Sequence, residues 1–139
     1  MTPQQVTLIH DSFAEVESEH SADVFYRRLF EVAPQLRPYF RDDMSEQRIK
    51  FMATLSMLVN SLGNLEIVLP AASRLARQHV EYGVKPEHYA IVGETLQWTF
   101  QRMLGLKWTR DIAEAWAAAY GMLSDHMIGE AYGRQNPAE

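Results

Sequence analysis

His79 is the residue whose type and position in this sequence most directly suggest chemistry. Apolar residues precede it at helical spacing: Leu65, Leu69, Ala72, Leu75 and Ala76. The next turn of this buried stripe therefore carries an imidazole, and an unpaired polar group buried there would cost about 1–3 kcal/mol. The imidazole must bond either to a neighbouring core group or to a metal or cofactor. The residue alone leaves both interpretations open.

The composition predicts one domain with a substantial core. The chain has 139 residues, of which 47% are hydrophobic and 11% aromatic. It contains no cysteine, which excludes disulfides, thiolate metal sites and a cysteine nucleophile.

The charge and hydropathy patterns narrow the class of partner. A formal net charge of −5 opposes a general attraction to nucleic acid. The first residues lack the pattern of a secretory signal, and no run of about 18 apolar residues could span a bilayer. We therefore expect a cytoplasmic protein that binds neither nucleic acid nor membranes.

Capping residues and helix breakers divide the first half of the chain into helices. Thr2 and Pro3 start a helix that reaches about Ser18, and Ser21 is the expected cap of a second helix, which Pro34 ends. The proline-rich segment 34–40 predicts one short turn. Ser45 is the expected cap of a long helix whose core face carries Ile49, Met52, Leu55, Leu58, Val59 and Leu62, and Gly63 stops it.

The second half continues in the same way. The helix that holds His79 ends at Gly83, Lys85 and Pro86 open another, and Gly105 breaks it. Thr109 starts the last helix, which fades near Gly133. We predict an all-α domain over residues 1–133 and a frayed tail at 134–139. Helices that cross at about 50° commonly enclose a pocket for a flat ligand.

Six short segments carry a resemblance to a known family, in order along nearly the whole chain: 25–30 (FYRRLF), 37–40 (RPYF), 64–70 (NLEIVLP), 79–84 (HVEYGV), 88–93 (HYAIVG) and 115–121 (AWAAAYG). With these segments the sequence resembles single-domain bacterial haemoglobins and the globin half of flavohaemoglobins. The resemblance implies a globin fold with helices packed around a haem pocket, a b-type haem, and His79 as the proximal ligand of its iron.

On the distal side, the resemblance implies that Tyr26 and Gln47 face the gas. It places Phe40 against the haem face, and Phe51, a helical turn past Gln47, where it narrows the pocket. A phenol O–H that donates to oxygen carrying partial negative charge forms a bond worth about 1.5–3 kcal/mol. Oxygen would then be retained about 10- to 100-fold longer.

On the proximal side, the sequence departs from its relatives. Tyr89 matches their proximal tyrosine, but the glutamate that follows the match of Tyr120 by eleven residues is replaced by Ala131, and Glu130 stands one place earlier. One residue corresponds to about 100° around a helix. Either the last helix shifts locally so that Glu130 supports His79, or the imidazole donates to a backbone carbonyl near Leu75, which we favour.

Other residues complete the expected site. Lys50, a turn past Gln47, could reach a haem propionate, and Leu75, Tyr82 and Val84 are expected to contact the haem. The remaining histidines have no His partner at i,i+3 or i,i+4 and are interpreted as surface or structural residues: His10, His20, His88 and His126.

The resemblance leaves three functional classes. The first is reversible binding of oxygen, nitric oxide and carbon monoxide, by a monomer or a homodimer. The second is a nitric oxide dioxygenase-type enzyme, for which we expect a separate reductase as partner because the sequence has no Gly-rich phosphate loop. The third is a gas-sensing globin.

Overall fold

The computed structural model describes residues 1–132, and every regular element within that range is helical. The expected frayed tail at 134–139 lies outside the described residues. The α-helices are α1 (Pro3–Val16), α2 (Glu19–Val32), α3 (Ser45–Ser61), α4 (Leu65–Glu81), α5 (Pro86–Leu104) and α6 (Arg110–Ala131). Two short 3₁₀ helices join them, η1 (Pro34–Tyr39) and η2 (Gly105–Lys107).

Local capping chemistry explains where the first and last helices begin. The Thr2 side chain accepts from the backbone N–H of Gln5, and the Gln5 side chain accepts from the backbone N–H of Thr2, which forms a capping box. Thr109 caps α6 by accepting from Ile112. Both starts agree with the prediction, whereas α1 ends at Val16, earlier than the expected Ser18.

Two predicted caps are wrong. Ser18, rather than Ser21, is the N-cap of α2, and Ser21 lies inside the helix with its hydroxyl donating to the carbonyl of Val16. Ser45 is the first residue of α3 instead of its cap, and its N–H donates to the carboxylate of Asp43. In both places a polar side chain earlier in the sequence accepts from a free backbone N–H at the start of the helix. The first residue of the helix therefore differs from the prediction, while the helix itself is the predicted one.

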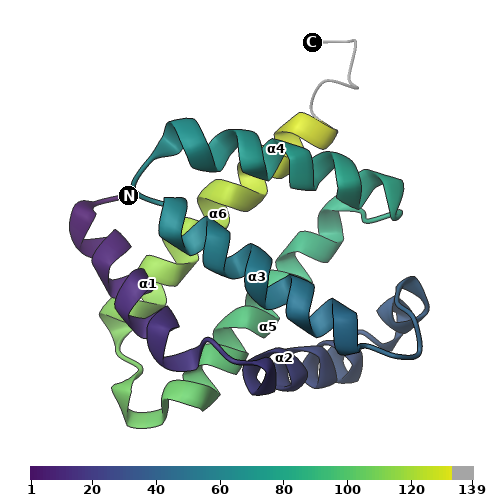
Figure 1. The fold of residues 1–139 in the computed structure, drawn as a ribbon, viewed down its shortest axis with the longest axis horizontal. Coiled ribbons are helices and arrows are strands. Elements are labelled where there is room, and N and C mark those ends of the chain that lie inside the picture. Colours follow the sequence, from purple (N-terminus) through teal and green to yellow (C-terminus); the bar gives the residue numbers. More distant parts are fainter. Residues whose placement is uncertain (133–139) are drawn as a thin grey trace.

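The six α-helices run in several directions and pack across one another (Figure 1). In this view α4 lies along the top and α2 along the bottom, while α3 crosses in front of α5 and α6. The closest packing joins α4 to α6, α1 to α6 and α2 to α5. Thus α2, α3 and α5 form one side of the molecule, and α4 with the C-terminal half of α6 forms another.

The core follows this division. A large cluster of buried side chains is built around Phe13, Phe25, Phe100 and Trp116, and the Trp116 indole donates to the buried Ser12 hydroxyl at 2.9 Å. A second, smaller cluster lies between α4, α5 and α6: Ala72, Ala76, Tyr89, Met127 and Ala131. None of the helices described has the length and apolar character needed to cross a membrane.

The buried stripe expected around His79 is only partly buried. Ala72 and Ala76 are fully buried, but Tyr82 is 71% exposed. On the expected core face of α3, Ile49 is 60% exposed, although Met52, Val59 and Leu62 are buried. Apolar side chains therefore remain uncovered on the facing parts of α3 and α4.

Candidate functional site

His79 lies in the last turn of α4 and is half-buried. Its Nδ1 donates to the backbone carbonyl of Leu75, one turn earlier, at 2.7 Å. This contact is the alternative that the sequence analysis favoured for the imidazole. Because Nδ1 carries the proton in this contact, Nε2 keeps a free lone pair, as a metal-binding histidine requires.

The Tyr89 ring lies beside the imidazole. The ring centroids of Tyr89 and His79 are 6.1 Å apart, and the planes are inclined by 28°. The Tyr89 hydroxyl is buried and has no hydrogen-bond partner within residues 1–132. Burial, with a smaller effect from Tyr132, raises the pKa of Tyr89 to about 12. An orphaned buried hydroxyl beside a histidine is a strong sign of a functional pocket.

The position of Tyr89 is fixed from behind by Tyr120. The Tyr120 hydroxyl donates to the backbone carbonyl of Tyr89 at 2.5 Å. The Tyr120 ring also lies directly on Gly93, where a Cβ atom would come within 2.5 Å of it. Only glycine lets α6 approach α5 this closely.

A second group of predicted residues is formed by other helices, where Tyr26 of α2 and Gln47 of α3 meet. The Gln47 amide Nε2 donates to the Tyr26 hydroxyl at 2.9 Å, joining residues 21 positions apart. Tyr26 is only 6% exposed. Burial raises its pKa to about 12, and the Gln47 hydrogen bond lowers it slightly. The phenol therefore stays protonated at neutral pH.

Aromatic rings enclose Tyr26. The Tyr26 ring lies 5.5 Å from Phe40 and 5.3 Å from Phe51, both in edge-to-face geometry. Phe51 also stacks on Phe25 at 4.4 Å. The structure thus brings three predicted residues into contact with the fourth, Tyr26: Gln47, Phe40 and Phe51.

The remaining predicted residues are more scattered. Lys50 is exposed on α3, and Leu75 and Val84 are half-buried against the smaller core cluster. The carbonyl of Val84 accepts from the Tyr132 hydroxyl. Tyr82 follows α4 and faces solvent. Their contacts with a haem remain predictions.

Glu130 lies beside a different histidine. Its carboxylate is 4.0 Å from Nε2 of His126, and the same nitrogen lies 2.8 Å from the hydroxyl of Ser73. The hydrogen-bond partner of the His79 Nδ1 is the carbonyl of Leu75. A role of Glu130 in supporting His79 stays a prediction.

Sequence reasoning missed the supporting tyrosines. Tyr120 was used only to align the last helix, and Tyr132 was not singled out, although both donate to backbone carbonyls near His79: those of Tyr89 and Val84. The signal available was Gly93, one helical turn after Tyr89, because a glycine inside a helix often marks a close approach.

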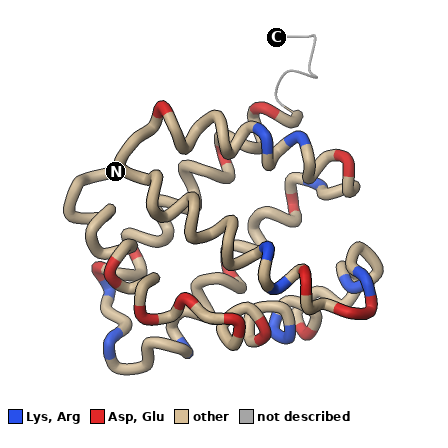
Figure 2. The backbone as a smooth tube through the Cα atoms, in the orientation of Figure 1, with Lys and Arg blue, Asp and Glu red and all other residues tan. Residues whose placement is uncertain are grey.

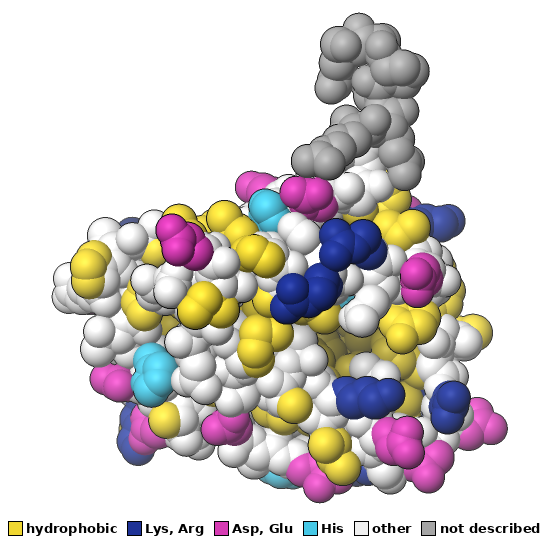
Figure 3. Space-filling model, turned by 45° about the horizontal axis from the view of Figure 1, so that its top comes forward, with side chains coloured by type: hydrophobic (Ala, Val, Ile, Leu, Met, Phe, Trp, Pro, Cys, Tyr) yellow, Lys and Arg dark blue, Asp and Glu magenta, His cyan; other side chains and the backbone are white. Residues whose placement is uncertain are grey.

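The described residues fit a flat prosthetic group between the two halves of the molecule. The core is divided into two clusters, and the orphaned Tyr89 hydroxyl belongs to the smaller one. Figure 3 shows a hollow on this face, lined by hydrophobic side chains and bordered by basic ones. An imidazole with a free Nε2 and a phenol with its own amide partner are suitable groups for the two faces of a haem.

Comparison with known proteins decides the family. The model of the globin family matches residues 23–127. The chain belongs to the globin family. Family membership implies a haem site, and the residues above fit one.

This globin is similar to the globin part of longer proteins. It is 33% identical over 135 residues to a flavohemoprotein of Bordetella parapertussis, covering 93% of this chain and 34% of the relative. It is 37% identical over 109 residues to a flavohemoprotein of Chromobacterium violaceum, covering 76% and 27%. The chain therefore spans about a third, or less, of the length of these curated relatives.

Solved structures resemble the globin over nearly its whole length. A bacterial globin from Campylobacter jejuni superposes with a TM-score of 0.83 at 27% identity, covering 96% of this chain and 99% of the other. An engineered carbene transferase from Rhodothermus marinus also gives 0.83, at 26% identity, covering 100% and 99%. The expected globin fold is thus confirmed.

Proposed function

We propose that this globin reversibly binds oxygen and other diatomic gases, including nitric oxide and carbon monoxide, at a b-type haem held by His79. A haem bound there, pentacoordinate or weakly hexacoordinate, would supply an iron to which a diatomic gas can bind. The observation that supports this function best is the 2.9 Å hydrogen bond from Gln47 to Tyr26. It gives Tyr26, which is otherwise surrounded by aromatic rings, the orientation of a hydrogen-bond donor.

The direction of that hydrogen bond determines what Tyr26 can do. Because the Gln47 amide donates to the phenol oxygen, the phenol hydrogen is left to donate elsewhere. The raised pKa of Tyr26, about 12, keeps this hydrogen in place at neutral pH. Tyr26 therefore holds a gas molecule that carries partial negative charge, as oxygen does, and slows its release.

The proximal contact favours holding a gas over activating it. The carbonyl of Leu75 is a neutral acceptor, and it attracts the Nδ1 proton of His79 less strongly than a carboxylate would. An imidazole that is polarised only weakly donates less electron density to a bound metal. His79 is therefore suited to reversible binding.

Aromatic and aliphatic side chains provide the remaining support. Phe40 and Phe51 exclude water from the phenol of Tyr26, because their rings pack against it. Leu75 and Val84 are half-buried beside the smaller core cluster and would present apolar surface on the proximal side. Lys50, exposed on α3, would attract an acidic group of the haem.

The test begins with haem binding. The purified protein, saturated with haemin, should show a Soret absorption band, and His79→Ala should abolish or strongly shift it. Gas-binding kinetics of the reduced protein then measure function. His88→Ala is the control, because it removes a histidine of α5 whose ring lies beside Tyr39, and it should leave the spectrum unaltered. A wild-type protein that stays colourless with excess haemin would refute the proposal.

The flavohemoprotein relatives favour one second candidate, a nitric oxide dioxygenase-type activity with a separate reductase. A single reaction of the oxygen-loaded protein with nitric oxide is expected of either function. Only continued nitric oxide consumption, driven by an added flavin reductase and NADH, supports the second candidate. A reaction that stops after one equivalent supports gas binding.

A further inference from the structure

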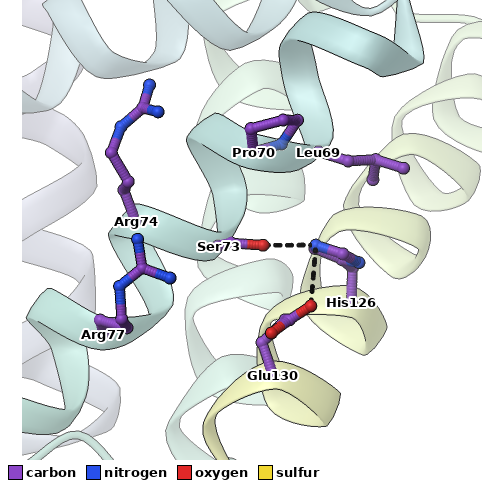
Figure 4. Close-up of a pocket in the computed structure, with 7 residues that line it drawn as sticks. All are labelled: Leu69, Pro70, Ser73, Arg74, Arg77, His126 and Glu130. Atoms are coloured by element: carbon purple, nitrogen blue, oxygen red, sulfur yellow. Dashed lines mark hydrogen bonds and ion pairs between the residues drawn. The ribbon is translucent and has the colours of Figure 1, made fainter.

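The structure has an open groove on the outer side of α4, apart from the candidate haem site. The groove has a volume of about 450 Å³ and lies between α4 and α6. Figure 4 shows the residues that line it: Leu69, Pro70, Ser73, Arg74, Arg77, His126 and Glu130. Nothing in the gas-binding proposal uses them.

The floor of the groove is polar, and a contact between α4 and α6 holds its side chains in place. The Ser73 hydroxyl of α4 points across to His126 of α6, and the Ser73 Oγ and His126 Nε2 atoms are 2.8 Å apart. Both side chains are half-buried. This pair offers a hydroxyl and an imidazole to a ligand at a fixed position.

One wall of the groove is strongly basic. Arg74 and Arg77 lie one turn apart on α4 and are exposed, and neither pairs with a carboxylate within residues 1–132. They are the two basic positions on α4 in Figure 2. In Figure 4 both stand on one side of Ser73, with His126 and Glu130 on the other. The single carboxylate of Glu130 leaves an excess of positive charge in the groove.

Such a set of groups matches a tetrahedral oxyanion. Guanidinium groups bind phosphate through paired, charge-assisted hydrogen bonds. The Ser73–His126 pair adds the donor that its own contact does not use. Leu69 and Pro70 at one end of the groove present apolar surface for the organic part of an ester. We propose that the α4–α6 groove binds a small phosphate-bearing molecule of the monoester class.

The groove lies directly behind the proximal histidine. Leu75, whose carbonyl accepts from His79, is placed between Arg74 and Arg77 on the same helix. A phosphate held by both arginines would therefore act on the turn of α4 that carries the acceptor of His79. This coupling is the part of the proposal that rests on the gas-binding function, and it predicts that phosphate changes the oxygen dissociation rate.

Binding is tested first without reference to gas. Inorganic phosphate is titrated into the haem-saturated protein by calorimetry, with chloride held at equal ionic strength. We expect saturable binding at one site, weakened at least tenfold by Arg74→Gln or by Arg77→Gln. Glu130→Gln should strengthen binding, because Glu130 is the acidic group among the described residues that line the groove.

Arg102→Gln is the matched control, since Arg102 is exposed on α5 and its guanidinium lies over the Trp98 ring instead of at the groove. It should change the affinity less than twofold. Absence of saturable binding, or equal weakening by Arg102→Gln, would overturn the site. Circular dichroism establishes that each variant is folded.

Regulation is measured separately, as the oxygen dissociation rate with and without saturating phosphate. A change in rate that Arg77→Gln removes supports the coupling. An unchanged rate in a protein that binds phosphate overturns the coupling and leaves the binding site. If the protein binds no gas, calorimetry still decides whether the groove binds phosphate.

Discussion

The amide of Gln47 donates to the phenol oxygen of Tyr26 across 2.9 Å, so the phenol hydrogen remains free to donate to a ligand. Gln47 of α3 thus orients the phenol of α2. In the proposed function, that phenol is the group that holds the gas.

Replacing Tyr26 with Phe removes this donor while keeping the ring. Oxygen dissociation should accelerate at least tenfold, because a hydrogen bond to a partly charged acceptor is worth about 1.5–3 kcal/mol. Stopped-flow displacement of oxygen by carbon monoxide measures the rate. The control Tyr39→Phe changes an exposed tyrosine in η1 and should leave it unaltered. An unchanged rate in Tyr26→Phe would contradict the distal role.

Replacing Gly93 with Ala should destabilise the protein by about 1–3 kcal/mol, as overpacking generally does. The new Cβ would stand 2.5 Å from the Tyr120 ring, which cannot move away freely because its hydroxyl is bonded to the Tyr89 carbonyl. Gly121→Ala is the control, since a Cβ there meets nothing within 4 Å. It should stabilise α6 slightly. Urea unfolding distinguishes the two, and equal stabilities would show that the close approach is relaxed at no cost.

Replacing Ser12 with Ala leaves the Trp116 indole N–H without its acceptor in the core. The expected cost is about 1–3 kcal/mol in the free energy of unfolding. Ser61→Ala removes a similar contact to the preceding helical turn, from an exposed hydroxyl, and should have little effect. If both variants lose the same free energy of unfolding, the hydrogen bond of the indole makes no special contribution to stability.

The buried tyrosines predict a loss of stability in alkali. The pKa of Tyr26 is raised to about 12 in the folded protein, and burial also raises that of Tyr120, whereas tyrosine in the unfolded chain titrates at about 10. The unfolded state therefore loses its phenol protons first. The contribution of each tyrosine is complete below pH 10 and falls by about 1.4 kcal/mol per pH unit above it.

Urea unfolding at several pH values between 8 and 11.5 measures this effect. Tyr120→Phe should show a shallower decline than the wild type, because one of the titrating groups is gone. Parallel declines in the two proteins would mean that Tyr120 does not titrate differently on unfolding.

Residue spacing was sufficient to predict the helices and their order, but not the exact positions where they begin. At Ser18 and Asp43, competing polar side chains lie within three residues of the predicted cap, and only the geometry of the chain decides which one is used. The spacing also predicted that Ile49 and Tyr82 are buried, but both are exposed. A helical pattern shows which face of a helix is apolar, and it does not show whether another helix covers that face.

The candidate site was predictable where single residues carry the chemistry, as with His79 and Tyr26. The partner of the His79 Nδ1 could be narrowed to two alternatives, since a one-residue shift on α6 changes the direction of Glu130 by about 100°. The contacts of Tyr120 and Tyr132 go to backbone carbonyls, and a carbonyl leaves no trace in the sequence.

The Tyr89 hydroxyl carries a consequence for the engineering of this globin. Because no group within residues 1–132 forms a hydrogen bond with this hydroxyl, an acceptor introduced beside it would give the phenol a first partner. That new bond would hold the Tyr89 ring more firmly against the imidazole of His79.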